Sequence, residues 1–410
     1  MDELLLLVHR IPYPPNKGDK IRSYHLLKHL SGHFRIHLGA FVDVAEDWAH
    51  TQAIANMVTG EIKLLPLHPR RARLRSAYGL LSGEPLTLPY YRDAALQAWV
   101  NRLMAERPIR HAVVYSSAMA QYLTAYPDLH RVIDFVDVDS DKWGQYAERK
   151  PWPLNWVYRR EARTLLAFER RIAGSFDAST FVSPAEAELF LQLAPECAGR
   201  VSHYSNGVDL EYFSPARDYD NPYPPSARVL VFTGAMDYWA NVDAVAWFAR
   251  EVFPAVHAQF PDARFYVVGS RPTAEVQALA NDAIVVTGSV PDIRPYLAHA
   301  QIAVAPLRIA RGIQNKVLEA MAMAKAVVVS PQALEGIAAE PGLEVLLAPD
   351  PAAFIAHIAA QLAQPDAMLG QAARRRVEQS YSWESNLQRV SQLLAQAPAE
   401  PTPAGQRRLA

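Results

Sequence analysis

Residues 302–329 read IAVAPLRIARGIQNKVLEAMAMAKAVVV, and this stretch decides the fold. Two short apolar runs, Ile302–Ala305 and Val327–Val329, flank a segment whose apolar residues recur at helical spacing. Continuous apolar runs are typical of strands that are covered on both faces of a parallel sheet. The stretch therefore predicts a strand, a helix that begins near Ile313 or Gln314, and a second strand.

The same alternation of apolar runs and helical stretches occurs twice along the chain. The other strand candidates are Leu4–Val8, Ile36–Val42, Ala112–Tyr115, Val132–Val136, Ala178–Val182, Val229–Thr233, Phe265–Val268 and Ile284–Thr287. Repeated strand–helix alternation is the pattern of α/β proteins with parallel sheets. We therefore predict the α/β class, with two Rossmann-like, doubly wound domains.

Prolines mark the boundary between these two domains. The segment Arg217–Ser226 holds three prolines, which disfavour both helix and strand. We predict an N-terminal domain at 1–215 and a C-terminal domain at 226–375. A last helix at 383–395 is expected to join the first domain, and the Pro- and Ala-rich tail at 396–410 is expected to be disordered.

The composition excludes several classes of protein. Lys and Arg number 41 and Asp and Glu 42, so the formal net charge of −1 argues against nucleic-acid binding through bulk positive charge. One cysteine cannot form an internal disulfide, which fits a reducing compartment. The apolar run Leu4–Val8 is too short for a secretory signal, and no run approaches about 18 apolar residues. These features predict a cytoplasmic protein.

The loop Ile11–Lys20 follows the first predicted strand and is the first candidate binding loop. Ligands of open parallel sheets bind beyond the carboxyl ends of the strands. Gly18 would let the backbone approach a ligand, and Asp19 is expected to cap the next helix, whose free amides attract phosphate. The alternative is an ordinary loop stiffened by its prolines.

The second candidate loop spans Pro306–Met321. Lys316 and Glu319 are three residues apart and therefore share one face of the predicted helix. Helix amides and a lysine would bind the diphosphate of a nucleotide sugar, and a carboxylate would accept hydrogen bonds from ribose hydroxyls. The alternative is a surface Lys–Glu pair that contributes a few tenths of a kcal/mol.

Aromatic and basic residues are interleaved in two parts of the first half. Trp143, Trp152, Trp156 and Tyr158 lie among Arg149, Lys150, Arg159 and Arg160, while Arg70, Arg71, Arg73 and Arg75 precede Tyr78. Such a surface suits an anionic membrane or a lipid-diphosphate acceptor. Tryptophan is usually well buried, however, so a core position with a solvated charged face is the favoured alternative.

The segment Arg311–Val329 resembles the donor-site signature and following strand of retaining GT-B glycosyltransferases of family 4. Supporting similarities are Ser205-Asn-Gly-Val-Asp209, Phe232-Thr-Gly-Ala-Met-Asp-Tyr-Trp-Ala-Asn241 and Tyr381-Ser-Trp383. The N-terminal loop and Asp134–Trp143 resemble glycosyltransferases associated with exosortase/PEP-CTERM systems. The resemblance spans about residues 4–395.

The resemblance implies a set of donor-site residues. Glu319 matches the second Glu of the family's Glu-x7-Glu pair and is expected on the ribose, whereas Arg311 stands where the first Glu would contact the sugar. Asn241 replaces a frequent Arg/Lys pair, and Lys316 with Arg311 would supply the positive charge for the diphosphate. The remaining residues expected to bind substrate are Gly18, Gly234, Gly288, Gly312, Ile313, Gln314 and Asn315.

Two acidic motifs, Asp137-Val-Asp139 and Asp139-Ser-Asp141, look like the D-x-D metal motif of the other large glycosyltransferase fold. In an extended segment this spacing would place both carboxylates on one side. The GT-B resemblance favours coincidence, so no metal and no cofactor are expected. Asp137 is instead expected to line the cleft from the first domain.

The activity that the resemblance implies is transfer of a sugar from a nucleotide-sugar donor to a glycan or lipid-linked acceptor, in exopolysaccharide or cell-surface glycan synthesis. The enzyme would be hexosyltransferase-like, cytoplasmic and in peripheral contact with the membrane. Two alternatives stay open: a nucleotide-sugar 2-epimerase, and a non-catalytic protein of the same fold that binds sugar nucleotides. No nucleic-acid partner is expected.

Overall fold

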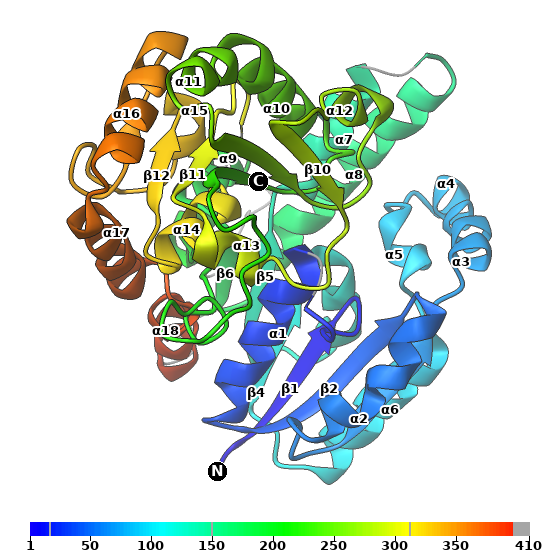
Figure 1. Ribbon diagram of the computed structural model, residues 1–410. Coiled ribbons are helices and arrows are strands. Elements are labelled where there is room, and N and C mark those ends of the chain that lie inside the picture. The colour runs from blue at the N-terminus through cyan, green and yellow to red at the C-terminus, as the bar shows by residue number, and fades with distance from the viewer. Residues whose placement is uncertain (16–17, 149–150, 311–312, 397–410) are drawn as a thin grey trace. The chain divides into compact units, whose positions relative to one another are not determined.

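A computed structural model describes residues 1–15, 18–148, 151–310 and 313–396 of the chain. The chain forms two compact units (Figure 1). The first unit comprises Met1–Ser205 and the chain from Leu387 on, and the second comprises Asn206–Asn386. Residues 397–410, which hold nearly all of the predicted disordered tail, lie outside the described residues.

The first unit is built on a seven-stranded parallel sheet in the order β3-β2-β1-β4-β5-β6-β7. The strands are β1 (Glu3–Val8), β2 (Arg35–Val42), β3 (Ile62–Pro66), β4 (His111–Tyr115), β5 (His130–Val136), β6 (Ala178–Phe181) and β7 (Val201–His203). The sequence did not predict β3 and β7. Both are edge strands whose residues are only partly buried, so neither shows a continuous apolar run.

The helices of the first unit connect these strands. They are α1 (Gly18–Ser31), α2 (Thr51–Ala55), α3 (Pro69–Ser76), α4 (Tyr78–Ser82), α5 (Thr87–Tyr90), α6 (Ala94–Glu106), α7 (Asp139–Glu148), α8 (Leu154–Ser175) and α9 (Pro184–Leu193). Three 3-10 helices lie at Ala45–His50, Ser117–Leu123 and Pro195–Arg200. Strand β1 is fully buried from Leu4 to Val8, which explains its continuous apolar run.

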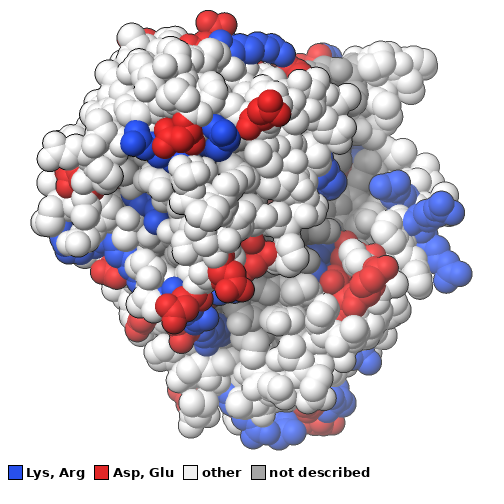
Figure 2. Space-filling model, viewed as in Figure 1, with Lys and Arg blue, Asp and Glu red and all other residues white. Residues whose placement is uncertain are grey.

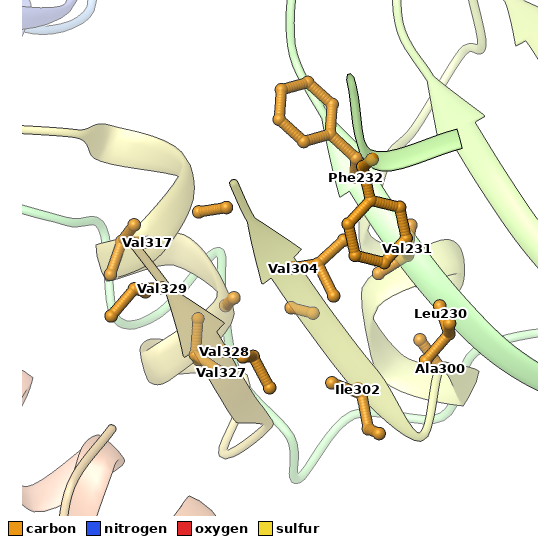
Figure 3. Close-up of a cluster of buried hydrophobic side chains, with 14 of the residues drawn as sticks. Leu230, Val231, Phe232, Ala300, Ile302, Val304, Val317, Val327, Val328 and Val329 are labelled. Atoms are coloured by element: carbon orange, nitrogen blue, oxygen red, sulfur yellow. The ribbon is translucent and has the colours of Figure 1, made fainter. Parts of the chain in front are cut away.

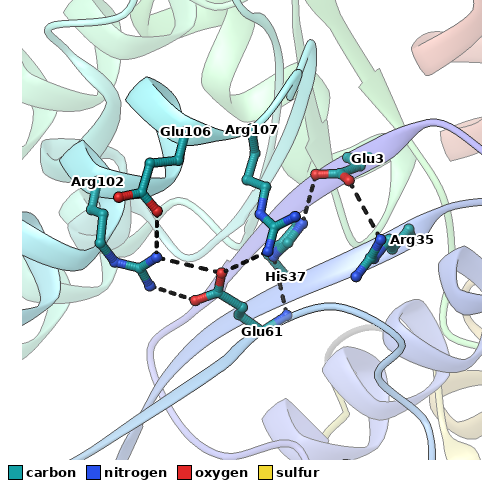
Figure 4. A network of polar contacts seen from close by, with 7 residues as sticks. All are labelled: Glu3, Arg35, His37, Glu61, Arg102, Glu106 and Arg107. Carbon is teal, nitrogen blue, oxygen red and sulfur yellow. Dashed lines mark hydrogen bonds and ion pairs between the residues drawn. The ribbon is translucent and has the colours of Figure 1, made fainter.

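Polar contacts join the strands β1 and β2 to the start of β3 and to α6 in the first unit (Figure 4). His37 Nδ1 accepts a hydrogen bond from the Glu61 amide at 3.1 Å, so its Nε2–H donates to Glu3 at 3.0 Å. Glu61 also pairs with Arg102 and Arg107. Because the side chains of Arg102 and Arg107 are 43% and 37% exposed, these ion pairs fix geometry more than they add stability.

A second, fully buried ionic cluster links α1 to the middle of the first sheet. Arg22 and Asp134 are each 1% exposed, and two guanidinium nitrogens donate to the two carboxylate oxygens at 2.7 and 3.1 Å. The Tyr204 hydroxyl donates to the same carboxylate at 2.5 Å, and the Thr180 hydroxyl lies 3.2 Å from it. The carboxylate is therefore well satisfied despite its burial.

The second unit is built on a six-stranded parallel sheet in the order β10-β9-β8-β11-β12-β13. The strands are β8 (Arg228–Thr233), β9 (Ala263–Val268), β10 (Ile284–Gly288), β11 (Ile302–Ala305), β12 (Ala326–Val329) and β13 (Leu346–Leu347). The predicted strand–helix–strand unit is confirmed as β11, α14 (Asn315–Ala322) and β12. Figure 3 shows Val317 of α14 beside Val329 of β12 in the core.

The other helices of the second unit are α10 (Trp239–Glu251), α11 (Phe253–Gln259), α12 (Ala274–Gln277), α13 (Arg294–His299), α15 (Pro331–Leu334), α16 (Pro351–Ala363) and α17 (Ala367–Ser380). The predicted linker Arg217–Ser226 contains no helix or strand. Helix α18 (Trp383–Ala395) begins in the second unit and continues, from Leu387, in the first. None of the described helices combines the length and the apolar composition that a membrane span requires.

Candidate functional site

The first turn of α14 is the centre of the candidate donor site in the second unit. Gln314 takes the N-cap position with an extended backbone, φ −89° and ψ 99°, and its side chain makes no cap hydrogen bond. Asn315 is the first helical residue and is half-buried. The first turn therefore presents backbone amides that suit an anion.

Lys316 extends from this first turn toward the helix that follows β8. Its ammonium donates a 2.9 Å hydrogen bond to Asn241 Oδ1 on α10, and lies 5.2 Å from the centre of the Phe232 ring. The Asn241 amide in turn donates to the Ala235 carbonyl at 2.9 Å, which fixes the orientation of the side chain. Burial lowers the pKa of Lys316 to about 8.

Glu319 lies one turn along the same helix. Burial raises the pKa of its carboxyl to about 7, and the charge of Lys316 partly opposes that shift. Neither group is surrounded by enough opposite charge to offset its desolvation. Incompletely compensated charges with perturbed pKa values are a mark of functional sites.

Two glycines bring the loops after β8 and β9 into contact beside Lys316. A Cβ atom on Gly269 would lie 1.6 Å from the Gly234 carbonyl oxygen. A Cβ atom on Gly234 would lie 2.8 Å from Asn241 Nδ2 and 3.5 Å from Lys316 Cε. Any larger residue at either position would therefore displace the loop. No sequence motif marks Gly269, because it is not part of a GxGxxG motif.

Other predicted donor-site residues occupy the same unit. Gly288 ends β10 with φ +68°, and open space surrounds the position of its absent Cβ. Ile313 is half-buried and lies 3.4 Å from the position that a Cβ on Gly336 would take. Arg311 and Gly312, which the sequence also placed in this site, lie outside the described residues.

Tyr212 and Arg294 form a feature that the sequence analysis did not select. The Arg294 guanidinium lies 3.8 Å from the centre of the half-exposed Tyr212 ring and pairs with Asp292 at 2.6 Å. Burial raises the pKa of the Tyr212 hydroxyl, and the charges of Asp292 and Glu319 add to the effect. The Tyr212 side chain is therefore close enough to Glu319 for the charge of that carboxylate to act on it. No short motif in the sequence marks this pair.

In the first unit, the structure corrects the predicted start of the first helix. Gly18 is the first described residue of α1, and a Cβ there would meet no other atom within 4 Å. Asp19 is therefore inside the first turn and is not the N-cap. Its carboxylate pairs with Arg10 and lies 3.4 Å from His9 Nε2, which explains why it does not cap.

The extended geometry expected for a D-x-D motif is wrong for Asp139-Ser-Asp141. Asp139 and Asp141 lie in the first turn of α7, so the Asp139-Ser-Asp141 spacing falls on a helix. Asp137 pairs with Lys142 at 2.5 Å, and Lys142 is also 3.6 Å from Asp139. Across the described residues, no group of three or more His, Cys, Asp or Glu side chains could hold a metal ion.

The aromatic residues of the first half divide into two sets. Trp143 is partly buried and packs edge-on against Tyr158, with ring centres 5.0 Å apart, as a core position predicts. Trp152 and Trp156 are 79% and 56% exposed, so the favoured core interpretation is wrong for both. Arg149 and Lys150 lie outside the described residues.

Residues 227–364 match the family model described as "Glycosyl transferases group 1". This range contains β8 to β13 and α14, and therefore Asn241, Lys316 and Glu319. No curated protein matches the chain. The matched range thus coincides with the part of the second unit that carries the geometry described above.

Solved structures share the fold of both units over nearly the whole chain. Sucrose-phosphate synthase from Thermosynechococcus elongatus is 17% identical, with a TM-score of 0.63 over 96% of this chain and 98% of that one. Anabaena HepE, solved in complex with UDP, is 15% identical, with a TM-score of 0.61 over 96% and 100%. WaaG, a glycosyltransferase involved in lipopolysaccharide biosynthesis, is 15% identical, with a TM-score of 0.59 over 96% and 100%.

These similarities define the class of the fold. The chain has the GT-B fold of glycosyltransferases, with two Rossmann-like parallel-sheet units, and the predicted fold class is confirmed. The family match in the second unit and the shared fold together support a glycosyltransferase.

Proposed function

We propose that the protein is a retaining glycosyltransferase that moves a sugar from a nucleotide-sugar donor to a glycan or lipid-linked acceptor. One observation carries the proposal: in the unit that matches the glycosyltransferase family, a half-buried lysine and a half-buried carboxylate one turn apart lie at a helix start without a side-chain cap. Such a site is suited to a diphosphate at one end and hydroxyl groups at the other.

Each residue of the site has a proposed role. Lys316 and the first amides of α14 bind the diphosphate, because an ammonium and oriented amides both stabilise phosphate oxygens. Asn241 orients the Lys316 ammonium through their 2.9 Å hydrogen bond. Glu319 accepts hydrogen bonds from the ribose. The contact between Gly234 and Gly269 leaves room for the donor beside Lys316.

The proposed chemistry needs no side-chain nucleophile. The phosphate of the leaving group takes the proton of the acceptor hydroxyl on the face from which the diphosphate departs, so the configuration is retained. Lys316 and the helix amides stabilise the departing diphosphate, which is the role that a metal ion plays in other enzymes. We therefore propose that activity is independent of divalent metal. We assign the acceptor to the first unit, where Gly18 and Asp137 lie.

A screen of nucleotide sugars tests the proposal. UDP-, GDP- and ADP-sugars are added to the full-length protein, and a donor that binds the folded state raises the melting temperature. The stabilising donor is then incubated with and without a panel of glycan acceptors. A glycosylated acceptor product with retained configuration supports the proposal. An epimerised donor formed without acceptor would identify a 2-epimerase, and binding without any product would identify a non-catalytic protein.

The biological setting that we propose is exopolysaccharide or cell-surface glycan synthesis in an exosortase/PEP-CTERM system. Two observations support it: the resemblance of Asp134–Trp143 to glycosyltransferases of those systems, and the shared fold with WaaG, which acts in lipopolysaccharide biosynthesis. Deletion of the gene in its host, followed by analysis of the surface glycan, tests the setting. An unchanged glycan would contradict it.

A further inference from the structure

Helices α3 and α4 of the first unit expose large apolar side chains to solvent. Leu74, Tyr78 and Leu81 are 78%, 61% and 86% exposed. They follow Arg70, Arg71 and Arg73, which are also exposed. We call these six residues the basic–apolar patch. Large apolar side chains that gather on a surface indicate an interaction site, whereas single exposed ones do not.

The basic–apolar patch has a charge unlike that of the whole protein. Residues 62–83 contain four Arg, one Lys and no Asp or Glu, although the whole chain carries a net charge of −1. Figure 2 shows basic side chains gathered over α3. Within the described part of the chain, Arg70, Arg71 and Arg73 form no hydrogen bond or ion pair, so their charge is left for a partner.

The patch is held firmly by the unit beneath it. Arg75, the fourth arginine, does not belong to the patch, because its guanidinium donates to the carbonyls of Pro89 and Tyr90 at 2.6 and 2.7 Å. These bonds anchor α3 to α5. The backbone that carries Arg70, Arg71, Arg73 and Leu74 is therefore held in place by α5.

Exposed aromatic residues at the start of α8 belong to the same supported region. Trp152 and Trp156 are 79% and 56% exposed. The buried Arg160 of α8 donates hydrogen bonds of 2.5 and 3.1 Å to the carbonyls of Gly79 and Glu84. Gly79 lies in α4, and Glu84 lies just after it. The next residue, Glu161, accepts hydrogen bonds from the Leu86 and Thr87 amides. These buried contacts tie α8 to α4 and α5.

We propose that the basic–apolar patch, together with Trp152 and Trp156, binds the surface of an anionic phospholipid bilayer. Arginine attracts anionic head groups, while Leu, Tyr and Trp side chains insert at the boundary between head groups and acyl chains. Because no described helix could span a bilayer, the contact is interfacial. A symmetric dimer through the patch would bring the like-charged arginines of two copies together, which disfavours that occupant.

Co-sedimentation of the full-length protein with vesicles tests the proposal. Vesicles of phosphatidylcholine alone are compared with vesicles that contain about one third phosphatidylglycerol. We expect binding to the anionic vesicles at low salt, at least about tenfold weaker binding at high salt, and a blue shift of tryptophan emission on binding. Equal binding to both vesicles, or no binding at low salt, would overturn the proposal.

Two variants and a matched control locate the contact. Arg70→Glu/Arg71→Glu/Arg73→Glu and Leu74→Ser/Leu81→Ser should each weaken binding by about tenfold or more. The control, Met368→Ser/Arg375→Glu, changes an exposed apolar and an exposed basic residue of α17 in the other unit and should bind like wild type. If the control loses as much vesicle binding as the two variants, binding does not depend on the patch, and the proposal is overturned. A dimer that Leu81→Ser dissociates would show that the patch joins two copies and would also overturn the proposal.

The inference does not rest on the proposed function. All substituted side chains are exposed and lie outside the proposed donor site, so stabilisation by a nucleotide sugar should be unchanged in every variant. If the protein binds a nucleotide sugar but no vesicles, only the proposal that the patch binds a bilayer is rejected. Failure of nucleotide binding with intact vesicle binding would reject only the proposed function.

Discussion

Lys316 Nζ donates a hydrogen bond to Asn241 Oδ1 at 2.9 Å, and thereby joins the helix after β11 to the helix after β8. The amide of Asn241 orients the ammonium but does not neutralise it. Glu319 is the opposite charge that acts on Lys316, and its effect is smaller than the effect of desolvation. A half-buried ammonium held in this way can pair with an anionic ligand.

The pKa of Lys316 predicts how nucleotide binding depends on pH. Its value of about 8 in the free protein means that most of the ammonium is lost at pH 9, whereas a bound diphosphate favours the protonated form. UDP affinity should therefore fall by about tenfold between pH 7 and pH 9, and binding at pH 9 should take up a proton. Calorimetry in two buffers that differ in ionisation enthalpy measures both effects.

The matched variant for this prediction is Lys316→Arg. A guanidinium stays protonated throughout this range, so the UDP affinity of the variant should change by no more than about twofold from pH 7 to pH 9, through ionisation of Glu319 alone. A wild-type profile as flat as that of the variant would show that Lys316 does not titrate in contact with the nucleotide.

Glu319→Gln and Glu319→Ala should weaken UDP binding by about tenfold or more. A hydrogen bond between a charged carboxylate and a ribose hydroxyl contributes about 1.5–3 kcal/mol, and the amide retains only part of it. The dissociation constant should therefore rise most for the Ala variant. Glu275→Gln, which removes an exposed carboxylate of the same unit, is the control. Wild-type affinity in both Glu319 variants would exclude a ribose contact.

Transfer activity should survive chelation. Asp137 and Asp139 both lie within 4 Å of the Lys142 ammonium, which leaves them less free to hold a divalent cation. We expect the same rate in EDTA as in Mg²⁺ or Mn²⁺, and no loss of activity in Asp139→Ala. An activity that EDTA abolishes, that Mn²⁺ restores and that Asp139→Ala lacks would instead establish a D-x-D metal site.

Arg22→Met and Asp134→Asn should each destabilise the first unit by about 3–5 kcal/mol. Removal of one member of a buried pair leaves the other charge without compensation in a low-dielectric interior. Tyr204→Phe, which removes one hydrogen bond to the Asp134 carboxylate, should cost about 1 kcal/mol. Urea denaturation of the three variants measures the differences. Equal free energies of unfolding for Arg22→Met and Tyr204→Phe would show that the ion pair does not dominate.

The sequence by itself determined the α/β class, the parallel sheets and the unit of β11, α14 and β12. Strands that are covered on both faces are apolar throughout, so their burial can be recognised in the sequence as a continuous apolar run. Lys316 and Glu319 could be selected for the same kind of reason, because a helix fixes the relation of residues three apart. The edge strands β3, β7 and β13 were not predicted, because their residues are only partly buried and form no long apolar run.

Only the tertiary structure decided which distant residues meet. Asn241 contacts Lys316 across 75 residues, and Gly269 contacts Gly234, because the carboxyl ends of neighbouring parallel strands converge at one edge of the sheet. The sequence also did not determine which tryptophan side chains are exposed. Trp143 is partly buried, while Trp152 and Trp156 face solvent, although all three have the same side chain. Local sequence fixes which element forms, but burial depends on what packs against that element, and residues far away in the chain supply the packing.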